Sequence, residues 1–426
     1  MADIRPFCAI RPSKDKAVLI AALPYDVYNR EEAREVVKDN KDSFLNIDRP
    51  ETQFEPGHDM YAPEVYAKAD EMLREMIADG RFIRDDAPCY YLYSLTMDGR
   101  TQTGIVAASS VDDYDNGVIK KHENTRAEKE ADRIRHVDTT SCQTGPIFLA
   151  YRRNESLSEI TKRVAATEPV YDFTSDDGIR HTVHVISDAD DVAAVKAAFD
   201  GISQIYIADG HHRAASAVKV SKLRREAKPG YTGDEEFNFF LSVLFPDDEL
   251  KIFDYNRVVK DLNGLSSEDF MTKLGAVVEV GEAQKEQIRP ASKGEFSMYL
   301  DGKWYLCKVK AKDIPSDPVE ALDVSLLQNL VLNPILGIAD PKTDNRIDFV
   351  GGIRGLKELE RRCDIDCKVA FAMYPTSISE LFDVADAGLL MPPKSTWFEP
   401  KLRSGLFIHE IERSTFSEGK CTSSNE

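Results

Sequence analysis

An abrupt change of pattern between Ile202 and Ala227 constrains the fold of this chain more than any other feature. The residues up to Ala208 are apolar and β-prone, as in a buried strand, whereas those after Gly210 are typical of a helix. Asp209 and Gly210 between them are a turn dipeptide. The sequence therefore predicts a strand, a tight turn and a helix, with the first free amides of the helix at the edge of a sheet.

The residues of this turn are open to three interpretations. A helix start favours an anion through its N–H groups and dipole, and His211, His212 and Arg213 would add donors in the first turn. Two adjacent histidines, among eight in the chain, also suggest a metal site. Neighbouring helical side chains point about 100° apart, however, and would share one zinc ion poorly. In the third interpretation Asp209 only caps the helix and the histidines are structural. We favour a phosphate cradle that includes Gly210.

A second group of polar residues precedes another expected helix. Thr125 and Glu128 have the spacing of a capping box, which predicts a helix from just after Thr125 to about Val137. His122 and Glu123 lie before that start, where a carboxylate can project into a cleft. Such a carboxylate is a candidate general base for a hydroxyl group.

Basic residues continue along the same helix. Arg126 and Arg133 are about two helical turns apart and should share one face, with Lys129 between them. A basic stripe of this kind can neutralise a phosphate. The alternative is a solvated helix with ion pairs such as Arg126 with Glu130.

Hairpins and strand–helix units alternate along the rest of the chain. The dipeptides Asp98-Gly99 and Asp301-Gly302 each separate two apolar runs, as in tight hairpins. Helices are expected over 30–40, 63–79 and 323–332. This mixture predicts an α+β (mixed α/β) fold with a mixed or largely antiparallel sheet, not a regular doubly wound one.

We divide the chain into five segments. An N-terminal α+β segment that packs on the core is followed by the core with the Asp-Gly-His-His-Arg motif, a small hairpin-containing subdomain, a C-terminal α+β subdomain and a tail that we expect to be disordered. Three polar stretches could line a pocket or could only form turns, and the last of them could also form a lid. In chain order, the five segments are 1–112, 113–260, 261–320, 321–412 and 413–426. The three polar stretches are 23–28, 44–51 and 392–405.

Composition restricts the partners. The net charge of −19 argues against nucleic acid and anionic membrane surfaces, because both need a basic footprint. The N-terminus has no apolar core of signal-peptide length, and no run approaches a membrane span. Seven scattered cysteines, an odd number, indicate reduced thiols. We therefore expect a cytoplasmic protein that binds small molecules, and a homodimer is compatible with the sequence.

Several motifs are spread along the chain: PYDV, IDRPE, KKHENT, GPIFLAY, ADGHHRAASA, NRVVKDLNGL and STWFEPKLRSGLFIHE. Together they resemble the bacterial family called domain of unknown function 1015, over residues 3 to 412. The segment Asp209–Arg213 is also similar to the Asp-Gly-His-His-Arg signature of free-serine kinases. Those kinases belong to the ParB/sulfiredoxin-like superfamily, which binds nucleotides and phosphates at this strand–turn–helix. Their His-Glu pair, placed before a helix with an arginine, matches His122-Glu123 and Arg133 in order.

This resemblance implies a ParB/sulfiredoxin-like core elaborated by N-terminal, insertion and C-terminal segments. It also implies a phosphotransferase that uses ATP or ADP with Mg²⁺ on a small hydroxylated metabolite, either as a free L-serine kinase or in the reverse reaction on phosphoserine. Two alternatives are a nucleotide-sensing protein without turnover and a metal-dependent phosphatase or hydrolase with His211 or His212 as ligand.

The implied roles fall into three groups. Glu123 would take the hydroxyl proton, with His122 beside it, and Asp209 would position Mg²⁺ and so take part in catalysis. The nucleotide phosphates would be held at the helix start, and an arginine would neutralise the transferred group. The residues for these last two roles are Gly210, His211, His212 and Arg213, with Arg126 or Arg133.

Overall fold

The computed structural model describes residues 1–411, which form two units. The first unit contains residues 1–120 and 124–250 and the chain from Pro400 onward, and the second contains 121–123 and 251–399. The expected disordered tail, 413–426, lies outside the described residues. Apart from the short piece 121–123, the chain leaves the first unit at Lys251 and returns to it at Pro400.

A nine-stranded sheet forms the centre of the first unit. β6 is parallel to β11 and β8 to β12, whereas the other neighbours are antiparallel. The mixed sheet confirms the predicted fold class. The strand order is β6 (Ile119–Lys120), β11 (Ile205–Asp209), β8 (Ile147–Tyr151), β12 (Phe239–Pro246), β5 (Arg100–Ser110), β4 (Tyr90–Met97), β10 (Arg180–Ile186) and β9 (Tyr171–Thr174), with β1 (Ile4–Arg5) paired to β5.

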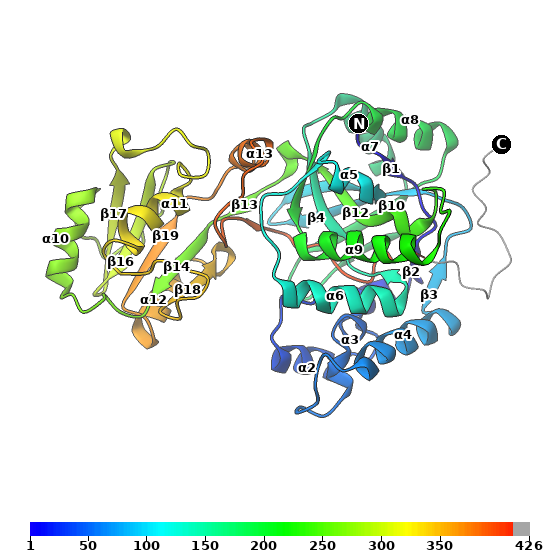
Figure 1. Ribbon diagram of the computed structural model, residues 1–426, viewed down its shortest axis with the longest axis horizontal. Helices are drawn as coiled ribbons and strands as arrows, with labels where there is room; N and C mark the ends of the chain where they lie inside the picture. Colours follow the sequence, from blue (N-terminus) through cyan, green and yellow to red (C-terminus); the bar gives the residue numbers. More distant parts are fainter. Residues whose placement is uncertain (412–426) are drawn as a thin grey trace. The chain divides into compact units, whose positions relative to one another are not determined.

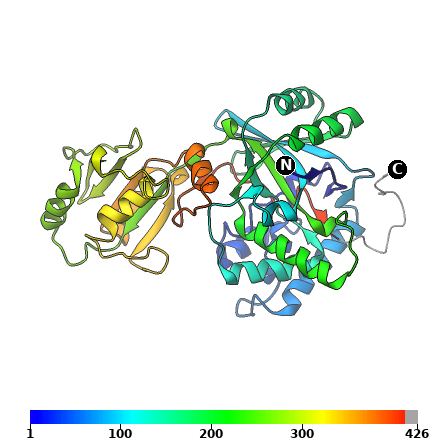
Figure 2. The same ribbon diagram turned by 45° about the horizontal axis from the view of Figure 1, so that its top comes forward.

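Helices cover one face of this sheet. α9 (His211–Ala227) packs beside α6 (Ala127–Thr140), and α4 (Pro63–Ala78) packs against α6 (Figure 1). Figure 2 shows the same neighbours from a second direction. α7 (Glu155–Ala165) and α8 (Ala189–Asp200) also pack together, and their apolar side chains join those of α9 in one core with the sheet. The small residues Ala214 and Ala217 are buried, which lets α9 lie close to the strands.

Local sequence signals account for most of these elements. In the β4–β5 hairpin, Asp98 and Gly99 both have positive φ, 51° and 77°, as a two-residue turn of this type requires. α2 (Arg30–Lys38) begins with a capping box formed by Asn29 and Glu32. The remaining short elements of this unit are β2 (Ile10–Pro12), α1 (Ala17–Ile20), α3 (Leu45–Asp48), β3 (Phe82–Arg84), α5 (Val111–Asp115), β7 (Cys142–Gln143) and β21 (His409–Glu410).

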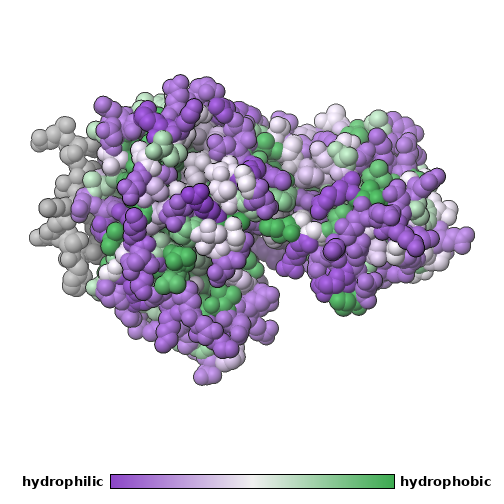
Figure 3. All heavy atoms as spheres, turned by 180° about the vertical axis from the view of Figure 1, so that it is seen from behind, coloured by the Kyte–Doolittle hydropathy of each residue, from purple (hydrophilic) through white to green (hydrophobic). Residues whose placement is uncertain are grey.

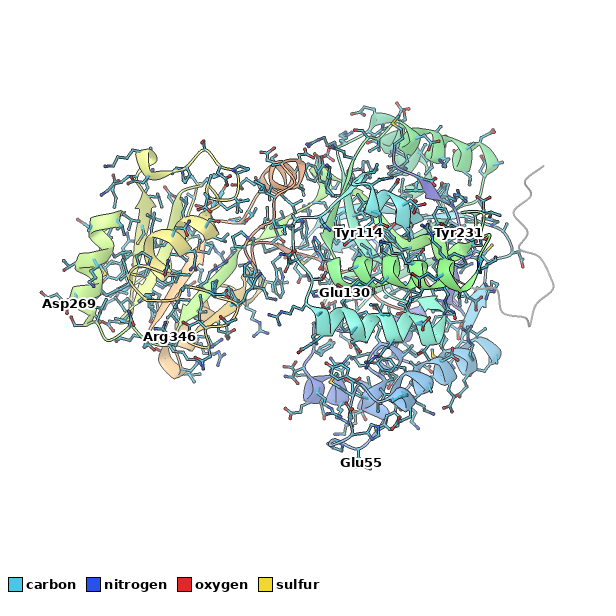
Figure 4. All side chains as sticks on the ribbon, in the orientation of Figure 1. Glu55, Tyr114, Glu130, Tyr231, Asp269 and Arg346 are labelled. Carbon is cyan, nitrogen blue, oxygen red and sulfur yellow. The ribbon has the colours of Figure 1, made fainter. Side chains whose placement is uncertain are left out.

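The capping box predicted at Thr125 is wrong. Arg126 is the N-cap of α6, and no side chain caps the helix. The Thr125 hydroxyl instead donates to Glu130 Oε2 at 2.7 Å, while Lys219 of α9 forms an ion pair with Glu130. Glu130, labelled in Figure 4, therefore ties α6 to α9, and this contact between helices replaces the local cap.

The second unit is built on a six-stranded sheet whose neighbours are all antiparallel. Its order is β15 (Val278–Val280), β17 (Lys303–Val309), β16 (Glu295–Leu300), β19 (Val369–Met373), β14 (Tyr255–Val259) and β18 (Ile347–Gly351). α12 (Leu356–Ile365) packs on this sheet through Leu356 and Leu359. The helix expected over 323–332 is α11 (Asp323–Leu327) followed by a π-helical turn, Gln328–Leu332. The other elements are β13 (Ile252–Phe253), α10 (Ser267–Val277), α13 (Ile378–Asp386) and β20 (Trp397–Phe398).

The limits of the two units differ from those of the five segments expected from the sequence. β4 and β5 belong to the predicted segment 1–112, yet β5 pairs with β12 and β4 with β10, both from 113–260. β14 lies entirely within the predicted segment 113–260 but belongs to the sheet of the second unit. Strand pairing between distant segments, which no local signal reports, decides these limits.

The surface agrees with the charged composition. Figure 3 shows that hydrophilic residues dominate the visible face of each unit, with apolar residues scattered among them. No helix within residues 1–411 is both long and apolar enough to cross a membrane.

Candidate functional site

The predicted strand–turn–helix is confirmed. β11 ends at Asp209, Gly210 is the N-cap of α9 with a φ of 93°, and the helix begins at His211 without a side-chain cap. A Cβ atom on Gly210 would lie 3.0 Å from Nε of Arg213. Glycine is thus needed here twice, for the left-handed backbone and for the close approach of the Arg213 guanidinium.

Asp209 is ionised, and both of its carboxylate oxygens accept hydrogen bonds. The backbone N–H of Gly210 donates to Oδ1 at 2.8 Å, and Lys401 Nζ donates to Oδ2 at 3.0 Å. Burial alone would raise the pKa of this carboxyl, but Lys401, Arg213 and these hydrogen bonds hold the pKa well below its usual range. Asp209 therefore places a negative charge at the helix start, and the N-cap itself is Gly210.

The two histidines of the motif differ in their surroundings. The backbone N–H of Arg126 donates to Nε2 of His212 at 2.9 Å. Burial lowers the pKa of His212, so its imidazole is neutral and accepts through Nε2. Any contact of His212 with a phosphate must then come from Nδ1. His211 is 6% exposed.

A pocket that is partly open to solvent lies beside Arg213 in the first unit, and its empty space, counted together with solvent at its mouth, is about 480 Å³. Polar groups from five separate stretches of the chain line it, and apolar side chains complete its wall. The pocket-lining residues are Pro24, Tyr25, Asp48, Arg133, His136, Val137, Gln143, Thr144, Gly145, Ile147, Arg213, Ser216, Ala217, Leu241 and Ser404. The stretches 23–28 and 44–51, predicted as pocket-lining or only as turns, therefore do contribute to a pocket.

Arg133 supplies the second positive charge of the pocket. Its side chain is buried, forms an ion pair with Asp132 at 2.9 Å, and lies 4.1 Å from the centre of the Tyr25 ring. Burial alone would raise the pKa of Asp132, but Arg133 and the hydroxyl of Tyr66 lower it, so the pair is charged. Two cations, Arg133 and Arg213, thus face one pocket.

The predicted basic stripe along α6 is wrong. Arg126 precedes the first residue of the helix and is exposed, whereas Arg133 is buried in the pocket wall. The two side chains therefore do not share a helix face. The alternative pair, Arg126 with Glu130, is replaced by the pair of Glu130 with Lys219.

Sequence reasoning missed several polar residues of the pocket, among them Thr144 and His136. Thr144 donates to Oδ1 of Asp48 at 2.9 Å. His136 Nε2 lies 2.9 Å from the carbonyl oxygen of Ile47 and therefore carries a proton, while burial and the charge of Arg133 lower its pKa. Ser404 enters from the far end of the chain. Ser404 belongs to the stretch 392–405, which was predicted as pocket-lining, as a lid or only as a turn. No local signal singles out His136 or Thr144, because each becomes a pocket residue only through contacts with distant segments.

His122 and Glu123 belong to the piece of chain that is grouped with the second unit. The backbone carbonyl of His122 accepts a hydrogen bond from Met391 N at 2.8 Å, and His122 is 2% exposed. Glu123 is half-buried. The catalytic role of this pair stays a prediction.

The family model described as "Protein of unknown function (DUF1015)" matches residues 4–325. The chain belongs to this family. The resemblance found from the motifs is therefore confirmed. No curated protein matches the sequence.

Solved structures offer distant likenesses. A free serine kinase in complex with AMP is 15% identical over 72% of this chain and 91% of its own, with a TM-score of 0.35. SbnI with a C-terminal truncation, from Staphylococcus aureus, is 11% identical over 70% and 85%, with a TM-score of 0.37. A conserved hypothetical protein from Pyrococcus furiosus is 16% identical over 71% and 94%, with a TM-score of 0.33.

Proposed function

We propose that this protein is a nucleotide-dependent phosphotransferase that acts on a small hydroxylated metabolite. Free L-serine is the expected acceptor, or phosphoserine the donor in the reverse direction. One observation carries the proposal: two arginines, Arg133 and Arg213, line one pocket, and Arg213 lies in the first turn of a helix that has no side-chain cap. Phosphoryl transfer depends on positioning and on neutralising charge, and this combination supplies both.

The phosphate groups would lie at the start of α9. The first-turn N–H groups at His211 and His212 would donate to phosphate oxygens, and Gly210 would allow their close approach. Arg213 would bind on the pocket side, where its guanidinium can hold two oxygens at once. Arg133 is better placed than the exposed Arg126 to neutralise the transferred group, because it lines the pocket.

The acceptor would lie in the pocket beside these arginines. Asp48, Thr144 and Ser404 offer hydrogen bonds to an amino or hydroxyl group there. Glu123 would accept the hydroxyl proton as the oxygen forms its bond to phosphorus, and the bond from phosphorus to the nucleotide would break. In the reverse direction the same groups would return the proton to the serine oxygen.

Asp209 matches Mg²⁺ in charge, because its carboxylate is ionised. The ion would neutralise phosphate charge. Lys401 already donates to Oδ2 of Asp209, so an ion bound through this oxygen would have to displace the ammonium group.

Phosphorus NMR tests the proposal directly. The protein is incubated with Mg²⁺, ATP or ADP and L-serine, and separately with AMP or ADP and phosphoserine, while nucleotide and phosphoserine are followed. We expect turnover of at least one pair. Nucleotide binding without turnover of any pair would favour the sensing alternative. Hydrolysis that needs a tightly bound transition metal would favour the phosphatase alternative.

A further inference from the structure

The strongest unexplained contact near the pocket comes from the end of the chain. Lys401 Nζ lies 3.0 Å from Oδ2 of Asp209, which precedes it by 192 positions. The Lys401 side chain is 17% exposed, far less than a typical surface lysine. The Asp209 side chain is 34% exposed, so this ion pair is partly shielded from solvent, unlike a fully solvated surface pair.

The residues that follow Lys401 are anchored to two separate stretches of the first unit. Arg403 is buried, donates to Ser175 Oγ at 3.1 Å, and pairs with Asp177. Ser404 exchanges backbone hydrogen bonds with Ala22, at 2.8 and 3.2 Å. These contacts fix the backbone next to Lys401, so its ammonium group is held at Asp209 instead of sampling solvent.

Gly405, which follows Ser404, further restricts the backbone of this segment. Gly405 has a φ of 81°, and a Cβ atom there would lie 2.5 Å from Cγ of Phe44. Its N–H donates to the carbonyl oxygen of Thr144 in the pocket wall at 3.2 Å. The segment is thus packed as part of the first unit.

The charge at the helix start depends on this lysine. Asp209 is ionised, and alone it would repel a phosphate group placed at the N–H groups of α9. Lys401 offsets that charge, and its ammonium group can donate more than the one hydrogen bond that Asp209 accepts. A divalent cation on Asp209 would do the same, and would have to take the position that the ammonium group holds.

We propose that Lys401 is the resident cation of the site: it replaces a divalent ion on Asp209 and binds the nucleotide phosphate together with the start of α9. This inference rests on the proposed function. Mg²⁺ is then carried by the nucleotide, and nucleotide binding itself needs no ion on Asp209. The C-terminal segment, which follows the second unit, completes the phosphate site of the first.

Two binding measurements on the full chain test this. ADP affinity is measured by calorimetry in EDTA, and Mn²⁺ affinity without nucleotide is measured by the EPR signal of the free ion. Lys401→Met removes the charge but keeps most of the stem. It should weaken ADP binding in EDTA at least about tenfold, because a charge-assisted hydrogen bond is lost. It should also strengthen Mn²⁺ binding about tenfold, because Asp209 loses its competitor.

The controls separate this effect from general damage. Lys222→Met removes an exposed lysine of α9, which pairs with Asp115 at 2.8 Å, and should change neither affinity. Lys401→Arg should retain most of the ADP affinity. Asp209→Asn, added to Lys401→Met, should abolish the gained Mn²⁺ affinity. Melting temperatures show whether each variant is folded.

The outcomes are distinct. Unchanged ADP affinity in EDTA, or unchanged Mn²⁺ affinity, in a folded Lys401→Met variant overturns the inference and leaves the phosphotransferase proposal standing. If the wild type binds no ADP at all, the nucleotide site itself is refuted. The Mn²⁺ comparison then still decides whether Lys401 shields Asp209 from cations.

Discussion

Replacement of Gly210 by alanine should damage both the stability of the first unit and its nucleotide affinity. The backbone at Gly210 has a φ of 93°, and an alanine in the left-handed region costs about 1–2 kcal/mol. In addition, the new Cβ atom would lie 3.0 Å from Nε of Arg213 and would shift the guanidinium by a few tenths of an ångström. Strain on the hydrogen bond from Arg213 to the carbonyl oxygen of Pro146 adds up to about 1 kcal/mol.

A matched control separates the cost of the left-handed backbone from the cost of the contact with Arg213. Gly80 also has a positive φ, 82°, but a Cβ atom there would meet no atom within 4 Å. Gly80→Ala should therefore cost only the backbone term, about 1–2 kcal/mol, and should leave ADP affinity unchanged. Gly210→Ala should cost about 2–3 kcal/mol and weaken ADP binding by up to about tenfold, because the Arg213 guanidinium is shifted from its position in the pocket.

The assay must report on the first unit. The two tryptophans of the chain, Trp304 and Trp397, both lie in the second unit, so their fluorescence does not follow unfolding of the first. Urea unfolding is therefore followed by hydrogen exchange of α9 amides, and ADP affinity by calorimetry. Equal stability losses for Gly210→Ala and Gly80→Ala, with unchanged ADP affinity in both, would refute the argument that Gly210 makes room for Arg213.

Three further predictions concern other charged groups. Arg133→Met leaves Asp132 buried without its partner and should lower the free energy of unfolding of the first unit in urea by about 3 kcal/mol. The same change at the exposed Arg135 should have little effect. Similar losses for both variants would contradict a buried pair. Glu123→Gln should abolish turnover in the NMR assay while ADP affinity stays within about twofold, and undiminished turnover would refute its role as base. Burial lowers the pKa of His181 to about 3, so the folded protein binds fewer protons than the unfolded chain at acidic pH. The free energy of unfolding should therefore fall by about 1.4 kcal/mol per pH unit as the pH drops from about 6.5 towards 3. The same slope in a His181→Gln variant would contradict this assignment.

Local chemistry was sufficient to predict the elements that carry the motif. The strand ending at Asp209, the glycine turn and the helix from His211 depend only on neighbours in sequence, and all three are present. The hairpin at Asp98-Gly99 was predictable for the same reason, since each residue must adopt a positive φ. The family is likewise readable from the motifs, because they are short and contiguous.

Helix details were less predictable where tertiary contacts compete with local ones. The spacing of Thr125 and Glu128 fits a capping box, but Thr125 bonds to Glu130, which also pairs with Lys219 of α9. The basic stripe failed similarly, because burial of Arg133 against Tyr25 requires the N-terminal segment to pack on α6. A partner helix or segment offered each side chain a better contact than its own helix did.

The sequence by itself determined the strand–turn–helix, the need for Gly210, and the types of residue that could hold a phosphate. Only the tertiary structure decided that Arg133 faces the same pocket as Arg213 and that Lys401 reaches Asp209. The reason is physical: turns and helix starts follow from backbone conformations and nearest neighbours, whereas a pocket is the space left when distant segments pack. Its lining depends on the pairing of strands and on the path of the chain after Pro400, which no short-range pattern encodes.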